Sequence, residues 1–157
     1  MFSRNAVEIK MTDGTTFLVD AEKEYVSLFK WHNKDGKGYP FTTVRPHLAI
    51  TEVLFGKPPE GMMWDHKDGN PKNNTSENIR AATMIQNTWN RSKIKRKCAS
   101  DYKGVHWMPK QGWGARITVE NRRLWLGAYE TEEEAARAYD KAALIHHGEF
   151  ARLNFPK

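Results

Sequence analysis

Apolar and polar residues alternate along several stretches of the chain, beginning near its N-terminus. Residues 7–11 and 15–19 alternate on either side of the turn signal Asp13-Gly14 and therefore predict a β-hairpin. A short helix is expected over residues 22–29. An edge strand is expected over residues 39–44, where proline is tolerated. The first part of the chain is therefore predicted to be β-rich.

Two ring side chains stand next to each other in this β-rich region, Trp31 and His32. Large aromatic side chains are highly buried on average but rarely buried completely, and histidine is intermediate. We therefore interpret Trp31 as a half-buried aromatic residue and His32 as an exposed histidine. No catalytic chemistry is predicted for this region.

A different pattern runs from residue 62 to residue 90. Residues 62–66 and 79–82 predict two strands, and Thr83 with Gln86 forms a capping box that predicts a helix after them. Asn74 and Glu77 form a similar pattern, which we expect to cap a short turn between the strands. These segments together predict a ββα unit.

Alternation resumes from Tyr102. Residues 102–107, 113–119 and 123–129 predict three antiparallel strands joined by short turns. Because side chains on a strand alternate between the two faces of a sheet, each face has its own composition. One face is expected to carry Ala115, Ile117, Val119, Leu124 and Leu126, and the other Arg116, Thr118, Arg123 and Trp125.

A helix is predicted after this sheet. Thr131 and Glu134 form a capping box, and Gly148 marks the end of the helix. The expected apolar stripe consists of Ala135, Ala138, Tyr139, Ala142 and Ile145. Small alanine side chains allow a helix to lie close to a sheet, so we expect the helix to cover the apolar face and leave the basic, aromatic face free.

Composition narrows the class of partner. The 157-residue chain has 25 Lys and Arg against 19 Asp and Glu, and its net charge of +6 favours a polyanion. Cys98 is the only cysteine, which excludes an intramolecular disulfide and paired-cysteine zinc sites, so no structural zinc is expected. Signal-peptide and membrane-span patterns are missing from the sequence, so a cytoplasmic location is expected.

Residues 91–97 carry a run of basic side chains without apolar periodicity. The five basic residues are Arg91, Lys93, Lys95, Arg96 and Lys97. Two interpretations have roughly even weight, a solvated linker and an arm that contacts phosphates, and the two are compatible. Each neutralised phosphate adds about 0.9 to the salt slope on duplex DNA, so the distinction can be measured.

One segment combines an acid, a histidine and several carboxamides. From Asp65 to Arg80 the sequence reads DHKDGNPKNNTSENIR, and Asn87 follows Asn78 by nine positions. Neighbouring residues at a strand end point in different directions, so Asp65 and His66 can face a metal ion and a water. The segment resembles the HNH nucleases, particularly the phage homing endonucleases with the pattern DHxDGNxxNNxxENLR.

This resemblance implies a role for each of four residues. Asp65 and the side-chain oxygen of Asn87 would hold one divalent ion, Mg²⁺ or Mn²⁺. His66 would activate the attacking water, and Asn78 would orient the His66 ring. The roles are chemically consistent, because Mg²⁺ prefers oxygen ligands and a histidine with a pKa of about 6.5 is a competent base.

The C-terminal part of the chain resembles the AP2 DNA-binding domain. The resemblance covers residues 102–157 and is carried by YKGV, RLWLGAYETEEEAARAYDKAA and ARLNFP. It implies that the three-stranded sheet enters the major groove of DNA. Arg123 and Trp125 match contact positions of the family, and Lys103 replaces an arginine. The predicted DNA face is completed by His106, Arg116 and Thr118, which depart from the plant pattern.

The whole chain is therefore predicted to be an α+β protein with three parts. Residues 1–90 form an HNH nuclease domain with an N-terminal β-rich subregion and a ββα-metal core, and residues 91–101 form a basic linker. Residues 102–157 form an AP2-like three-stranded antiparallel sheet packed on one helix. The predicted function is that of a metal-dependent, homing-type endonuclease that nicks double-stranded DNA, without an obligate protein partner or a membrane. If the gene is carried by a phage, the expected location is the host cytoplasm.

Two other functions stay open. A non-catalytic DNA-binding regulator could keep a nuclease-like scaffold, and it is favoured by Thr51-Glu52, which stand where the resembling family often carries a His-Arg pair. An RNA-processing nuclease is the weaker alternative, because the major groove of RNA is narrow.

Overall fold

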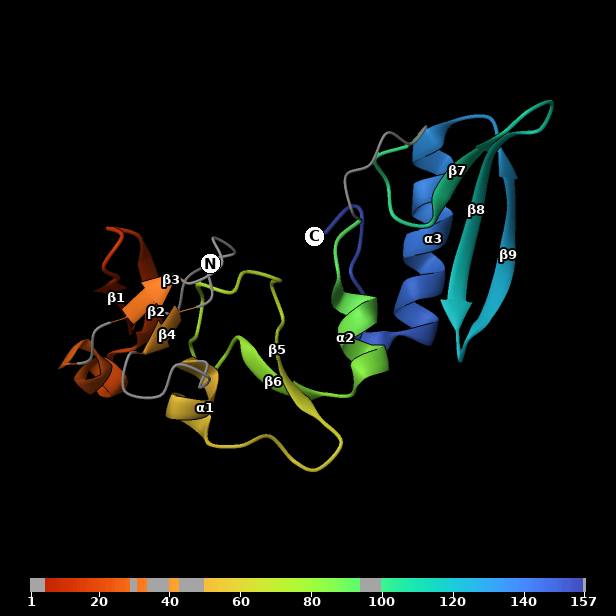
Figure 1. The fold of residues 1–157 in the computed structure, drawn as a ribbon. Helices are drawn as coiled ribbons and strands as arrows, with labels where there is room; N and C mark the ends of the chain where they lie inside the picture. The colour runs from red at the N-terminus through yellow and green to blue at the C-terminus, as the bar shows by residue number, and fades with distance from the viewer. Residues whose placement is uncertain (1–4, 29–30, 34–39, 43–49, 94–99, 157) are drawn as a thin grey trace. The chain divides into compact units, whose positions relative to one another are not determined.

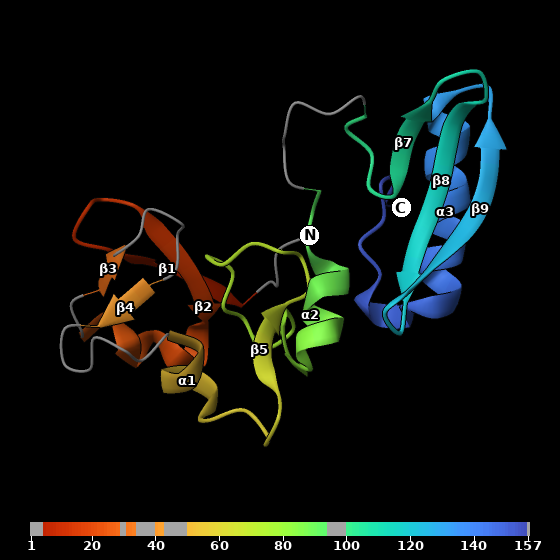
Figure 2. The ribbon, with the colours of Figure 1, turned by 45° about the vertical axis from the view of Figure 1, so that its right-hand side comes forward.

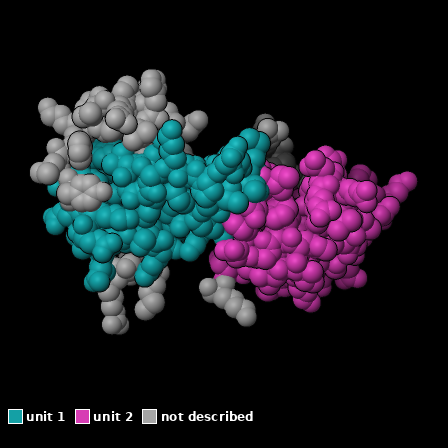
Figure 3. All heavy atoms as spheres, turned by 90° about the horizontal axis from the view of Figure 1, so that it is seen from below, with its two compact units in different colours: residues 1–84 teal, residues 85–157 magenta. Residues whose placement is uncertain are grey.

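The computed structural model describes residues 5–28, 31–33, 40–42, 50–93 and 100–156. The chain forms two compact units, residues 1–84 and 85–157, which Figure 3 colours separately. Short helices and small antiparallel sheets occur in the described ranges (Figure 1), which confirms the predicted α+β class. No helix within those ranges is both long and apolar enough to cross a membrane.

The first unit begins with the predicted hairpin. Strands β1 (Ala6–Lys10) and β2 (Thr16–Asp20) pair antiparallel, with Val7 opposite Val19. In the turn, the Asp13 carboxylate accepts hydrogen bonds from the backbone N–H and the hydroxyl of Thr15, at 3.0 and 2.7 Å. The alternation therefore predicted this element correctly.

The next elements are short. A 3₁₀ segment, η1 (Ala21–Leu28), stands where a helix over residues 22–29 was expected. Strand β3 (Trp31–Asn33) pairs antiparallel with β4 (Pro40–Thr42), and helix α1 (Ile50–Phe55) follows. The strand expected over residues 39–44 is thus present over its described residues.

Trp31 belongs to the core of the first unit, so its interpretation as half-buried was wrong. Its side chain is 1% exposed and packs edge-on against Phe17, with ring centroids 5.5 Å apart. Its indole N–H is satisfied by the Val26 carbonyl at 2.7 Å, which allows complete burial. His32 is half-buried rather than exposed, and its Nδ1 lies 2.8 Å from the Thr12 hydroxyl.

The central hairpin is also present. Strand β5 (Met63–His66) pairs antiparallel with β6 (Ile79–Ala82), and helix α2 (Met84–Asn90) follows in the chain. The two strands and the helix have the predicted order and nearly the predicted bounds. Nearly all of α2 belongs to the second unit, so the packing of α2 on the hairpin, and with it the ββα unit, stays a prediction.

The second unit is a three-stranded antiparallel sheet covered on one face by a helix (Figure 2). The strands are β7 (Val105–Met108), β8 (Gly112–Val119) and β9 (Arg122–Tyr129), with β8 in the middle. Helix α3 (Glu132–His146) starts at the predicted capping box of Thr131 and Glu134, and the short 3₁₀ segment η2 (Gly148–Phe150) follows it. This confirms the predicted sheet and helix.

Small residues bring α3 close to the sheet. Ala135, Ala136, Ala142 and Ala143 are buried against Val105, Ala115 and Ile117. Gly104, at φ +79°, lies under Tyr139, where an added Cβ would be 2.0 Å from a ring carbon. The C-terminal segment is fixed by Asp140, whose carboxylate accepts the backbone N–H groups of Asn154 and Phe155 at 2.8 and 2.9 Å.

Two predicted core residues of this unit are in fact exposed. Ile145 is 78% exposed, because the helix face that meets the sheet runs through Tyr139, Ala142 and Ala143 and Ile145 lies outside it. Leu124 is exposed on β9, which is an edge strand. The predicted apolar faces were therefore right at their centres and wrong at their margins.

Candidate active site and nucleic-acid interface

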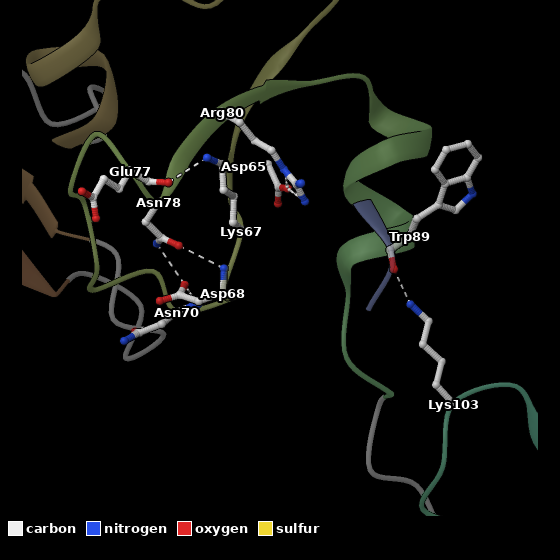
Figure 4. Close-up of polar contacts among 9 residues, drawn as sticks. All are labelled: Asp65, Lys67, Asp68, Asn70, Glu77, Asn78, Arg80, Trp89 and Lys103. Atoms are coloured by element: carbon white, nitrogen blue, oxygen red, sulfur yellow. Dashed lines mark hydrogen bonds and ion pairs between the residues drawn. The ribbon is translucent and has the colours of Figure 1, made fainter. Parts of the chain in front are cut away.

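Asp65 and Arg80 form a buried ion pair at the centre of the β5–β6 hairpin. The strand register places them opposite each other. Arg80 donates from Nε at 3.0 Å and from Nη2 at 2.9 Å to Oδ2 of Asp65, whose side chain is 6% exposed (Figure 4). A guanidinium with two N–H groups on one carboxylate makes a strong, charge-assisted contact. Asp65 is therefore held in a fixed position at the end of β5.

His66 is the next residue on β5, and it is buried with 8% exposure. Its Nε2 lies 3.1 Å from Oδ1 of Asn74, in the loop between the two strands. Burial lowers the pKa of His66, and this effect outweighs the Asn74 hydrogen bond and the nearby carboxylates of Asp68 and Asp65, which raise it. His66 is therefore neutral at neutral pH, as a general base must be.

Asn78 holds the loop between the strands. Its side-chain oxygen accepts the N–H of Asp68 at 3.0 Å, and its nitrogen donates to Oδ1 of Asp68 at 3.0 Å (Figure 4). The same nitrogen donates to the Asn73 carbonyl at 2.7 Å. Nε2 of His66 makes its hydrogen bond with Oδ1 of Asn74. The role implied for Asn78, orienting the His66 ring, stays a prediction, and Asn74 had been expected only to cap a short turn.

Asp68 organises the same loop. Its carboxylate also accepts the backbone N–H of Asn70 at 2.7 Å and the side-chain N–H of Asn73 at 2.8 Å. Lys67 crosses the base of the loop and donates to the backbone carbonyl of Glu77 at 2.7 Å. These hydrogen bonds within the loop fix the surroundings of the residues at the end of β5.

Strand β2 supports this loop from outside the motif. The Leu18 N–H donates to the Lys72 carbonyl at 2.6 Å, and the Leu18 carbonyl accepts the Asn74 N–H at 2.8 Å. Asp20 accepts the Ser76 N–H at 2.9 Å. No chemistry was predicted for the N-terminal hairpin, but it provides a support that the sequence pattern did not reveal.

The predicted DNA face of the second unit is assembled by strand pairing. Arg116 on β8 stands opposite Trp125 on β9, and Thr118 stands opposite Arg123. All four are exposed, and Trp125 is 54% exposed. His106 on β7 is half-buried and points its ring edge toward the Trp125 indole, with centroids 6.0 Å apart. These five side chains form a basic and aromatic surface on the side of the sheet opposite α3.

Comparison with known proteins matches each of these two regions to a family. A family model for HNH endonucleases matches residues 45–88, and one for the AP2 domain matches residues 100–147. An uncharacterized HNH endonuclease of Acanthamoeba polyphaga mimivirus is 34% identical over 148 residues, which cover 90% of this chain and 75% of that protein. The chain belongs to the HNH endonuclease family. Its architecture is an HNH region followed by an AP2 domain.

Two further relatives match shorter stretches of this HNH protein. Protein 3.8 of Escherichia phage T7 is 32% identical over 110 residues, covering 69% of this chain and 89% of that protein. An AP2/ERF and B3 domain-containing protein of rice is 52% identical over 58 residues, covering 37% of this chain. The chain spans only 16% of the rice protein, so that likeness concerns the AP2 domain alone.

Two lysines that were predicted to contact DNA bind backbone carbonyls of the second unit. The Lys103 ammonium donates to the carbonyl of Trp89 near the end of α2 (Figure 4) and to the carbonyl of Arg91, just after the helix. Lys93 donates to the carbonyls of Tyr102 and Val105 at 2.9 and 3.3 Å. Burial lowers the pKa of Lys103 to about 8, so it is still charged at neutral pH. These contacts give both lysines a structural role.

Of the remaining basic residues of the predicted arm, the structure describes Arg91. Arg91 is exposed just after α2. Lys95, Arg96 and Lys97 lie outside the described residues. Their contact with DNA stays a prediction.

The two predicted metal ligands fall in different units. Asp65 is buried in the first, and Asn87 is half-buried on α2 in the second. Within the described ranges, no three His, Cys, Asp or Glu side chains cluster as metal ligands would. One carboxylate and one carboxamide oxygen fit an ion that prefers oxygen and keeps several waters. Asp65 would have to share its carboxylate with Arg80.

Proposed function

We propose that this protein is a metal-dependent endonuclease that cuts one strand of duplex DNA and that its AP2 domain positions the HNH motif on the substrate. The observation that supports this most is the end of β5, where the fixed carboxylate of Asp65 precedes a buried, neutral His66. A neutral imidazole next to a fixed acid is the arrangement needed to deprotonate water beside a phosphate.

The residues of the chain have separate tasks in this mechanism. His66 takes the proton of the attacking water, and the loop held by Asn78 and Asp68 keeps the histidine in place. Asp65 and the side-chain oxygen of Asn87 would hold one Mg²⁺ or Mn²⁺. When bound, the divalent ion supplies positive charge at the scissile phosphate and the leaving 3′ oxygen. Because the chain carries one such motif, each engagement cuts one strand.

The AP2 domain would supply binding and orientation. Arg116, Arg123 and Trp125 lie on an exposed strand pair that fits the major groove of DNA. Arginine can donate two hydrogen bonds to a guanine edge, and the net charge of +6 favours the phosphate backbone. We therefore propose that the substrate is double-stranded DNA. We also propose that the protein acts on it in the cytoplasm.

One observation favours a second function, a DNA-binding regulator without cleavage activity. The carboxylate proposed to hold the metal ion is already paired with Arg80. In a protein that no longer binds a metal ion, this ion pair would serve only to stabilise the hairpin. The AP2 domain would bind DNA in either case.

Cleavage of supercoiled plasmid with random inserts distinguishes the two functions. We expect the wild-type protein to produce nicked circles with Mg²⁺ or Mn²⁺ and none with chelator. His66→Ala should abolish nicking while retaining a gel shift, whereas His146→Ala, which changes an exposed histidine on α3, should nick normally. Normal cleavage by His66→Ala would disprove the assignment of His66 as the base. A gel shift without cleavage by the wild type, on a library that contains its binding site, would favour the regulator.

A further inference from the structure

The side chain of Asn74, in the loop between β5 and β6, lies in hydrogen-bond contact with the His66 ring. It is 0% exposed, and its Oδ1 lies 3.1 Å from Nε2 of His66. A fully buried carboxamide has to satisfy both its oxygen and its nitrogen within the protein. The partners of Asn74 therefore decide what it can do for His66.

The second partner fixes the orientation of the carboxamide. Nδ2 of Asn74 donates to the Pro71 carbonyl at 3.3 Å. A carbonyl oxygen can only accept, so the nitrogen must face Pro71 and the oxygen must face His66. Because that oxygen is also only an acceptor, Nε2 of His66 has to carry the hydrogen.

The backbone of Asn74 is held as firmly as its side chain. Its N–H donates to the Leu18 carbonyl at 2.8 Å, and the neighbouring Asn73 forms a parallel bridge with Leu18 on β2. The N-terminal hairpin therefore fixes the point from which the carboxamide reaches His66. A ring held in this way keeps one tautomer and one orientation.

We propose that Asn74 is a positioning residue that keeps His66 in its Nε2–H tautomer, so that Nδ1 is the nitrogen that receives the proton of the attacking water. This rests on the proposed function of His66. In that step an O–H bond of water breaks, its electron pair stays on the oxygen, and an N–H bond forms at Nδ1. The imidazolium that results still donates from Nε2 to Asn74.

Nitrogen NMR of the histidine rings tests the tautomer without any cleavage. Using metal-free, full-length protein above the ordinary titration range of histidine, with His66 assigned by its absence in His66→Ala, we expect the Nε2–H tautomer. Asn74→Asp should keep it, because a carboxylate accepts the same hydrogen bond. Asn74→Leu should lose it, whereas Asn70→Ala, which removes a loop asparagine with no contact to His66, should not. A wild-type ring in the Nδ1–H form would overturn the proposal.

Cleavage kinetics test the consequence for the reaction. We expect Asn74→Leu to lower the rate constant of nicking about 10²-fold or more, because general bases contribute about 10²- to 10⁴-fold. DNA affinity should stay unchanged, and Asn74→Asp should restore most of the rate. Equal rates for Asn74→Leu and the wild type would overturn the positioning role. If the wild type shows the Nε2–H form but never cleaves DNA, the proposed function fails and the tautomer assignment stands.

Discussion

Asn78 is buried and uses both ends of its carboxamide inside the loop that follows β5. We expect Asn78→Ala to lower the free energy of unfolding of the first unit by about 2 kcal/mol, because it leaves the Asp68 N–H and the Asn73 carbonyl without a partner. Denaturant titration followed by hydrogen exchange of first-unit amides measures this loss. Asn70→Ala is the control, because its side chain makes one exposed hydrogen bond to Lys72 and its loss should cost well under about 1 kcal/mol.

The same experiment separates two roles of Asn78. A loss of stability together with slower cleavage would support a scaffold role acting through the loop. Full stability with lost cleavage would contradict it and favour the catalytic role that the family resemblance implies.

The ion pair of Arg80 with Asp65 allows a test of whether Asp65 is a metal ligand. Removing one partner of a buried ion pair typically costs about 3–5 kcal/mol, so Arg80→Met should destabilise the first unit by about that amount. If Asp65 binds the ion, Mg²⁺ at about 100 times its dissociation constant should restore about 2.7 kcal/mol. Thermal unfolding with and without Mg²⁺ measures both effects.

The double variant Arg80→Met with Asp65→Asn is the control, because it removes the charge that would attract the ion. No stabilisation of Arg80→Met by either Mg²⁺ or Mn²⁺ would show that Asp65 is not a metal ligand. The regulator would then be the better description of the chain.

At the scale of single residues, the sequence predicted those whose placement depends on their spacing along the chain. Asp65 and His66 adjoin at the end of the strand that was expected over residues 62–66. Asn74 could not be predicted in the same way, because its contact depends on the Pro71 carbonyl and on a backbone bridge to Leu18, more than 50 residues earlier. Sequence patterns indicate local periodicity but not such distant support.

Helix α2 is an element whose surroundings the sequence did not predict. Trp89 stacks on His147 with centroids 4.4 Å apart and rings 10° from parallel, and Lys103 caps the end of the helix. A cation at a helix C-terminus binds the carbonyls that have no partner within the helix. The AP2 domain therefore holds the helix that carries Asn87.

We expect Lys103→Met to weaken this attachment of α2 by about 1 kcal/mol, because it removes the charge-assisted hydrogen bonds but leaves part of the packing. Hydrogen exchange of the α2 amides should become several-fold faster. Lys141→Met, which changes an exposed lysine on α3, should leave exchange unchanged. Unchanged exchange in Lys103→Met would mean that Lys103 does not hold the helix.

The stability that His147, the stacking partner of Trp89, contributes to the second unit should depend on pH. Burial lowers the pKa of His147, and Lys103 and His146 lower it further, against the hydrogen bond to the Thr118 carbonyl. The pKa in the folded state is thus below the ordinary value of about 6.5. Stability from this group is complete above that value and is lost as the pH falls through the folded pKa.

Unfolding of the second unit should therefore become easier between neutral and mildly acidic pH. Replacement of the imidazole by a ring that does not titrate, His147→Phe, should reduce this dependence, whereas His146→Phe, on the exposed side of α3, should keep it. A pH dependence that is identical in His147→Phe and the wild type would exclude His147 as its source.

At the scale of elements, strands and caps were predictable because they depend on short patterns. The β1–β2 hairpin and the three strands of the AP2 domain follow from alternation, and the β5–β6 strands were expected beside the capping patterns of the central segment. Helix α1 was not predicted, since six residues are too few to show a helical period. The unit to which α2 belongs depends on ring stacking and on Lys103, which no local pattern encodes.

The whole molecule has a net charge of +6, and five of its basic residues lie in the segment between the HNH region and the AP2 domain. Lys93 is used inside the second unit, so the arm interpretation now depends most on Lys95, Arg96 and Lys97. If each of these neutralises one phosphate, changing all three to Gln should lower the salt slope of DNA binding by about 2.7, at about 0.9 per phosphate. Gel shifts on duplex DNA over a range of salt concentrations measure the slope.

A variant with the same net charge is needed, because a change in total charge alone alters long-range attraction. Lys10 and Lys57 are exposed in the first unit and Lys141 is exposed on α3, and changing them to Gln also removes three charges. If the segment is an arm, only the first variant loses slope, and its specificity ratio is preserved since phosphate contacts carry no sequence information. Equal, small losses in both variants would identify the segment as a linker, and the AP2 sheet would then have to supply the phosphate contacts through Arg116 and Arg123.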